Sequence, residues 1–179
     1  MKNDTFCGYS RKFSIVFVKQ RILILAGVCK KAGFRTDDCG RYALMNGLRF
    51  AEYKTYNEAE IMALYSSVGW SNYTNNPAML RQAYKSSLYV LAAYADDKLV
   101  GIIRAVGDGA SIVFLQDLIV LPEYQRHGIG SQLMRRVMKK YADVYQLQLL
   151  TESSEKNIAF YEYVGLKRVE KYGCCAFMR

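Results

Sequence analysis

Long apolar runs are missing from this chain of 179 residues, although 51% of its residues are hydrophobic. No stretch approaches the ~20 consecutive apolar residues that span a bilayer, which argues against a transmembrane helix. The chain has one histidine, so Ser-His or Cys-His nucleophilic catalysis is not expected, and the five cysteines lack the spacing of metal ligands. We therefore expect a metal-free domain with a substantial core, in the reducing compartment of the cytoplasm.

Acidic residues are scarce at the start of the chain, which makes the net charge of +9 uneven. Residues 1–44 carry nine Lys/Arg against three Asp/Glu, a net +6, whereas residues 45–179 carry sixteen against thirteen, a net +3. The later part is only mildly basic, which favours an anionic cofactor but does not indicate nucleic acid. We expect residues 1–44 to be a dispensable N-terminal extension, non-native or disordered. A membrane-surface anchor is the alternative, because basic and apolar residues are interleaved there.

From Leu48 onward the pattern is typical of a regular domain that contains both strands and helices. Residues 45–179 are expected to form this domain, and no internal repeat interrupts it. Strands are predicted at 48–54, 87–94, 98–106, 112–121, 144–151, 167–172 and 175–178. Helices are predicted after the Asn57–Glu60 capping box, from Asn76-Pro77, from Ile129 and over 157–164, where Gly165 ends the helix. This order predicts an α/β (α+β) fold with a mixed, mostly antiparallel central sheet and helices on both faces.

Two glycines stand where the strand 112–121 leads through a loop into a helix. The loop is Gln125-Arg126-His127-Gly128-Ile129-Gly130, and the apolar helix positions Ile129, Leu133, Val137 and Tyr141 follow at four-residue spacing. The first N–H groups of a helix have no intrahelical partner, so this junction is predicted to bind a phosphate. It is neither a dinucleotide fingerprint, which needs a third glycine where Leu133 stands, nor a P-loop, which needs a following Lys-Ser/Thr pair.

The residues Gln125, Gly128 and Gly130 resemble the Q/R-x-x-G-x-G/A signature of the GNAT N-acetyltransferase superfamily. The flanking residues 121–124 and 131–133 are similar to that family too, and the resemblance extends over about residues 47–179 through Trp70 and Asn157–Tyr161. It implies a GNAT-like acyl-CoA N-acyltransferase fold. It also implies transfer of an acetyl group from acetyl-CoA to an amine by direct attack in a ternary complex.

The resemblance also implies which residues bind acetyl-CoA. The backbone of the strand before the loop pairs with the pantetheine arm, and Asn157 hydrogen-bonds this arm or only caps its helix. The pyrophosphate lies on the loop and the start of the helix, with the positive end of the helix dipole. The expected cofactor-binding residues are Leu118, Ile119, Val120, Gln125, Arg126, His127, Gly128, Ile129, Gly130, Ser131 and Asn157.

For the chemistry, the resemblance makes Tyr161 the general acid, since a phenol with a pKa near ~10 can protonate a departing thiolate. The alternative is a tyrosine that only packs against its neighbours. Asp117 is the preferred general base, with Glu152 as the other candidate, and both carboxylates have structural alternatives. Three further residues, Trp70, Tyr73 and Arg104, are expected to line the acceptor pocket, although Trp70 is also explained as a core residue.

The leading hypothesis is therefore an acetyl-CoA-dependent N-acetyltransferase whose acceptor is an amine of a small molecule or peptide. A non-catalytic acyl-CoA sensor on the same fold is the alternative. A nucleic-acid-binding protein is the third possibility, and the absence of an aromatic-basic stacking pattern argues against it. Stable membrane association is not expected, and a homodimer is possible.

Overall fold

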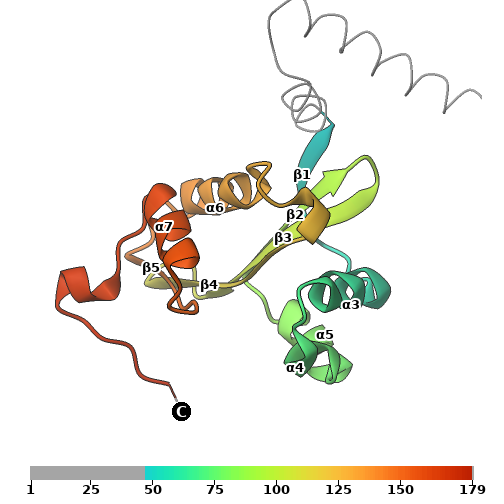
Figure 1. Cartoon of the computed structure of the whole chain (residues 1–179). Coiled ribbons are helices and arrows are strands. Elements are labelled where there is room, and N and C mark those ends of the chain that lie inside the picture. The colour runs from blue at the N-terminus through green and yellow to red at the C-terminus, as the bar shows by residue number, and fades with distance from the viewer. Residues whose placement is uncertain (1–46, 179) are drawn as a thin grey trace, which may run out of the picture. The chain divides into compact units, whose positions relative to one another are not determined.

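The computed structural model describes residues 47–178, so the proposed extension 1–44 lies outside the described residues. Its five strands form one sheet in the order β1-β2-β3-β4-β5 (Figure 1). The pairs β2–β3 and β3–β4 are antiparallel, whereas β4–β5 is parallel, which confirms the predicted mixed sheet. The strands are β1 (Leu48–Glu52), β2 (Tyr89–Ala95), β3 (Lys98–Gly107), β4 (Ile112–Val120) and β5 (Gln146–Leu149).

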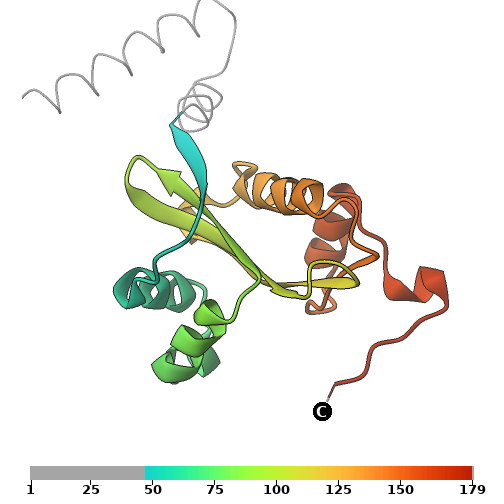
Figure 2. The same ribbon diagram turned by 180° about the vertical axis from the view of Figure 1, so that it is seen from behind.

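Helices cover both faces of this sheet, as predicted. Helix α6 packs against β2, β3 and β4 on one face, and α3 packs against β3 and β4 on the other (Figures 1 and 2). Every residue of β3 from Leu99 to Ala105 is buried, which requires cover on both sides of that strand. The helices are α3 (Glu58–Ser67), α4 (Ser71–Thr74), α5 (Pro77–Lys85), α6 (Ile129–Lys140) and α7 (Glu155–Tyr163).

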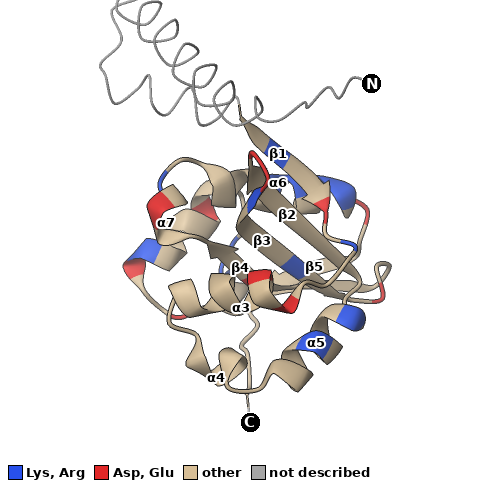
Figure 3. Ribbon diagram, turned by 90° about the vertical axis from the view of Figure 1, so that its right-hand side faces the viewer, with Lys and Arg blue, Asp and Glu red and all other residues tan. Residues whose placement is uncertain are grey.

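The predicted helix starts are correct for α3 and α5. Asn57 Oδ1 accepts the N–H of Ala59 at 3.1 Å, and Asn76 Oδ1 accepts the N–H of Met79 at 3.1 Å. Charge joins the two helices, because Arg81 pairs with Glu58 at 2.6 Å across the exposed surface. Figure 3 shows acidic residues at the start of α3 and basic residues on α5. Such exposed pairs contribute only about 0–1 kcal/mol, so the shared core holds these helices together.

The predictions for the C-terminal part are partly wrong. Residues 167–172 and 175–178 were expected to be strands, but the first range contains the 3-10 helix η2 (Val169–Tyr172) and the second has no regular element. Val169 is the only half-buried residue of 167–172, so the run has no apolar face to lay against a sheet. Gly173 at φ 69° then ends η2.

Smaller differences concern element boundaries and short additional helices. Strand β5 is shorter than the predicted 144–151, and α7 begins at Glu155, because Ser154 accepts the N–H of Asn157 at 3.3 Å as its cap. The short helix α4 was not expected. A second 3-10 helix, η1 (Pro122–Tyr124), follows β4. Gly165, at φ 103°, ends α7 as predicted.

The tight connection between β3 and β4 supports a stability prediction. Gly107 has φ +132°, and a Cβ built on it would overlap the carbonyl oxygen of Ile112. We expect Gly107→Ala to lower the free energy of unfolding by ~1–3 kcal/mol, measured by urea denaturation. Gly109→Ala is the matched control. Its Cβ would meet the Leu88 side chain at an ordinary 3.5 Å, so only its positive φ of +76° adds strain. Equal losses in both variants would contradict this prediction.

The described residues also bear on membranes and metals. No helix within 47–178 is long and apolar enough to cross a membrane. In the same range no group of three His, Cys, Asp or Glu side chains is arranged to hold a metal ion. Cys174 and Cys175 are exposed free thiols.

Candidate functional site

The glycine loop forms an open junction at the start of α6. Gly128 precedes the helix with φ 79°, a left-handed conformation that favours glycine. The N–H of Gln132 donates to the Gly128 carbonyl at 3.0 Å, so the N–H groups of residues 129–131 precede the first intrahelical bond. A helix start of this kind attracts a phosphate through its N–H groups and its dipole.

The loop lies close to both the end of β4 and the helix α7. Gln125 Nε2 donates to the Val120 carbonyl at 3.0 Å and so ties the loop to the strand. A Cβ built on Gly130 would lie 3.5 Å from the Phe160 ring and 3.9 Å from Val120. In the same loop, the ring nitrogen Nδ1 of His127 is buried and has no hydrogen-bond partner among the described residues. The glycine loop 125–130, the end of β4 and α7 therefore meet at one place.

The second half of β4 is unpaired on the side that faces β5. The parallel pairing runs from Ile112 to Leu115 and stops there, while β4 continues to Val120. On this side residues 118–120 have no strand partner in the described part of the chain, and the Val120 carbonyl accepts the Gln125 side chain instead. An extended arm that carries amide groups, as in CoA, fits such an edge, because it can pair as an additional strand.

A cavity of about 460 Å³ opens beside this edge. It brings together seven residues that the sequence had singled out: Trp70, Tyr73, Asp117, Leu118, Glu152, Asn157 and Tyr161. The other lining residues are Asn72, Leu115, Gln116, Met134, Leu149, Leu150 and Thr151. The predicted pocket residue Arg104 does not line the cavity, and neither do Ile119 and Val120.

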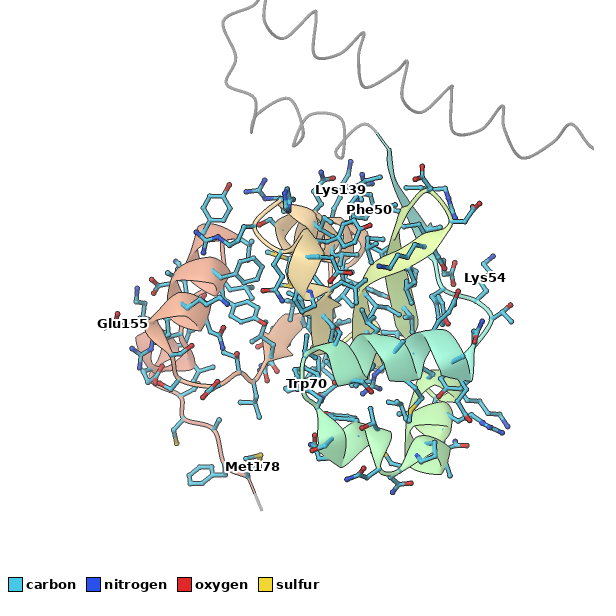
Figure 4. The ribbon with its side chains drawn as sticks, turned by 45° about the vertical axis from the view of Figure 1, so that its right-hand side comes forward. Phe50, Lys54, Trp70, Lys139, Glu155 and Met178 are labelled. Carbon is cyan, nitrogen blue, oxygen red and sulfur yellow. The ribbon has the colours of Figure 1, made fainter. Side chains whose placement is uncertain are left out.

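One wall of the cavity is aromatic. Trp70 and Tyr73 stack with ring centroids 5.6 Å apart, and both pack against the fully buried ring of Tyr65. Figure 4 shows Trp70 just beyond the end of α3, on the side toward α7. The Tyr73 hydroxyl accepts a hydrogen bond from Gln116 Nε2 at 3.2 Å. The α4 segment, which periodicity did not predict, therefore supplies this wall and is linked to β4.

Asp117 and Arg104 form a buried ion pair behind the cavity wall. Arg104 Nε donates to Asp117 Oδ2 at 2.7 Å, and the two side chains are 8% and 1% exposed. Arg104 therefore does not lie among the residues that line this cavity, because its guanidinium is paired with Asp117. The second oxygen, Oδ1, is buried without a hydrogen-bond partner among the described residues, although Asp117 lines the cavity.

Tyr161 reaches the cavity from the middle of α7. Burial raises the pKa of its phenol, and a hydrogen bond with Thr151 offsets part of this rise. The phenol consequently keeps its proton at neutral pH, as a general acid must. Glu152 lies on the exposed rim of the same cavity.

Asn157 holds the segment between β5 and α7. Its Nδ2 donates to Thr151 Oγ1 at 3.1 Å and to the Glu152 carbonyl at 3.3 Å. Since Ser154 caps α7, the alternative that Asn157 is the helix cap is wrong. These bonds use the amide nitrogen, which leaves the amide oxygen as the acceptor that a ligand could use.

Four polar or flexible lining residues are not among the site residues predicted from the sequence: Asn72, Gln116, Met134 and Thr151. Gln116 gave a usable signal, since it is a polar residue inside an apolar strand. Met134 gave none, because a methionine on the apolar side of a helix is indistinguishable from an ordinary core residue.

Comparison with known proteins agrees with this geometry. A family model described as an acetyltransferase (GNAT) domain matches residues 52–176. A relative from Prochlorococcus marinus, named an uncharacterized N-acetyltransferase ycf52-like, is 27% identical over 132 residues, which cover 72% of each chain.

Two solved structures extend the comparison. A GNAT-family acetyltransferase from Streptococcus pneumoniae TIGR4 is 42% identical with a TM-score of 0.68, and the match covers 74% of this chain and 96% of that one. AAC(6')-Iy, solved with the bisubstrate analog CoA-S-monomethyl-acetylneamine, is 16% identical with a TM-score of 0.58, over 74% of this chain and 97% of that one. The second likeness shows the fold alone. On the match of the family model, the chain belongs to the GNAT acetyltransferase family.

Proposed function

We propose that this protein transfers an acetyl group from acetyl-CoA to a primary amine of a small molecule or peptide, by direct attack in a ternary complex. The observation that carries the proposal is the meeting of three features in one place: the phosphate junction at α6, the unpaired edge of β4 and the cavity that holds Tyr161. A neighbour of the same fold was solved with an analog that joins CoA to an acetylated amine, which supports a shared site for both substrates.

In this proposal the chain's backbone binds the cofactor. The pyrophosphate lies on the N–H groups at the start of α6, with residues 125–131 around it. The pantetheine arm pairs with the backbone of residues 118–120, and Asn157 accepts a hydrogen bond from it. The acetyl group then points into the cavity between Tyr161 and the aromatic wall.

The reaction needs three groups in the cavity. A neutral amine nitrogen attacks the thioester carbonyl carbon, so that a C–N bond forms and the C–S bond breaks. The Tyr161 hydroxyl gives its proton to the departing sulfur. Asp117, through the oxygen that Arg104 leaves free, takes a proton from the amine through water, and Glu152 at the rim is the alternative acceptor.

The lining residues also indicate what kind of acceptor fits. Glu152 is the exposed charged side chain in the cavity wall, whereas Asp117 is paired with Arg104 behind it. Trp70 and Tyr73 add two aromatic rings. An amine that arrives as a cation is favoured by the Glu152 carboxylate and by the faces of the rings. The residues described as lining the cavity include no lysine or arginine that would pair with an acidic acceptor.

The proposal predicts that the protein releases free CoA thiol only when acetyl-CoA and a suitable amine are both present. The measurement is a thiol-detecting assay with a panel of polyamines, aminoglycosides and peptides with free amino termini, with amine-free reactions as the control. Binding of acetyl-CoA without thiol release across the whole panel would instead support the sensor function.

A further inference from the structure

The ion pair between Arg104 and Asp117 stands at an irregular point of the sheet. Between β3 and β4 the register passes from Ile102 opposite Ile119 to Arg104 opposite Gln116, so β4 contains one residue more than β3. The extra residue is accommodated at Asp117, whose φ of 56° lies in the left-handed region. This conformation costs an L-residue about 1–2 kcal/mol, so contacts elsewhere must hold it.

The irregular point coincides with the loss of pairing between β4 and β5. The last β4 residue paired with β5 is Leu115, and the bulge follows within two residues. A bulge bends its strand and increases the local twist. The bulge therefore sets the direction of residues 118–120, whose unpaired edge is the proposed binding edge for the cofactor arm.

Arg104 is itself fixed from outside the two strands. Beside its bond to Asp117, its guanidinium donates to the Ala83 carbonyl at 3.5 Å and to Ser87 Oγ at 3.4 Å. Both partners lie at the end of α5 and the start of the segment that leads to β2. The arginine thus connects α5, β3 and the bulge of β4.

Stability alone does not explain such a pair. Both charges leave water, and this cost cancels much of their attraction, so an apolar pair of similar size is often equally stable. An apolar pair, however, would not fix the orientation of the two side chains, because apolar contacts are not directional. We propose that Arg104 is a positioning residue, which holds Asp117 in the bulge and thereby aligns the β4 edge at residues 118–120 for the arm of CoA.

This inference rests on the proposed function, and binding of CoA tests it without any need for catalysis. Arg104→Met/Asp117→Asn removes both charges together, and asparagine still accepts the left-handed conformation. We expect this double variant to keep a melting temperature close to that of the wild type, but to bind CoA about tenfold or more weakly in calorimetry. Wild-type affinity in the folded double variant would overturn the proposal.

A second variant covers the case in which the double variant does not fold. Arg104→Lys keeps a positive charge beside Asp117, but one ammonium cannot reproduce the fork that also reaches Ala83 and Ser87. We expect its CoA affinity to fall about threefold or more with the fold intact. An unchanged affinity would contradict the positioning role.

A control and a second readout separate the two proposals. Leu80→Ala removes a fully buried side chain of α5 and should lower the melting temperature while leaving CoA affinity unchanged. Amide hydrogen exchange at Ile119, which pairs with Ile102 of β3, should be about tenfold faster in the double variant than in the wild type. If the wild type fails to bind CoA, the proposed function is wrong, whereas equal exchange rates in the double variant and the wild type would refute the role of Arg104.

Discussion

Replacing Tyr161 with phenylalanine is expected to lower kcat by about 10²–10⁴-fold with little change in the affinity for acetyl-CoA. The substitution keeps the ring that packs on Phe160 at a centroid distance of 5.1 Å and removes only the proton donor. Single-turnover kinetics measure kcat where chemistry limits the rate, and calorimetry measures the affinity. Tyr163→Phe is the matched control, because Tyr163 lies on the same helix, is 69% exposed and does not line the cavity.

The dependence of kcat on pH tests the role of Tyr161 as general acid independently. Because burial raises the pKa of Tyr161, the general acid keeps its proton above the ordinary phenol value of ~10. The alkaline fall in kcat that belongs to this tyrosine is therefore expected above that pH and should be absent in Tyr161→Phe. A variant with the kcat of the wild type would show that Tyr161 only packs.

Replacing Gly130 with glutamate is expected to abolish CoA binding while the protein stays folded. A side chain at this position would enter the phosphate junction, and its carboxylate would repel the pyrophosphate. The fold should survive, because the site of a Cβ is 3.5 Å from the Phe160 ring, an ordinary contact. A carboxylate in the first turn of a helix is also favourable. Calorimetric titration with CoA and a thermal melt measure the two quantities.

Gly130→Ala separates charge from the loss of glycine. It adds only the Cβ, and alanine favours a helix by about 1 kcal/mol over glycine. We expect it to fold at least as well as the wild type and to bind CoA more tightly than Gly130→Glu. An unchanged CoA affinity in Gly130→Glu would remove the basis for a cofactor site at this junction.

Local signals in the sequence predicted much of this fold. Asn57 and Asn76 cap their helices as expected, since a cap is set by the side chain and the two or three N–H groups beside it. The alternation of apolar and polar residues failed at 167–172, where the same residues form η2. A strand needs a neighbouring strand to pair with and an apolar surface to pack against, and a short run of residues specifies neither.

The residues of the candidate site also fall into two groups, those that a local sequence pattern predicts and those that only the fold brings together. The sequence is enough to predict the family signature at Gln125–Gly130, a phosphate site at the start of the helix and, through the family resemblance, the candidate acid Tyr161. These features depend on residue types at short spacing along the chain.

The packing of the folded chain determines how distant segments meet. It placed Trp70 and Tyr73 opposite α7, and it put Arg104 behind Asp117 instead of in the cavity. It also showed that β4 leaves β5 after Leu115 and so exposes an edge. Such relations depend on strand register and on a single left-handed residue, Asp117, in a run whose composition reads as an ordinary strand. Register is a property of two paired strands, so the pattern of one strand cannot specify it.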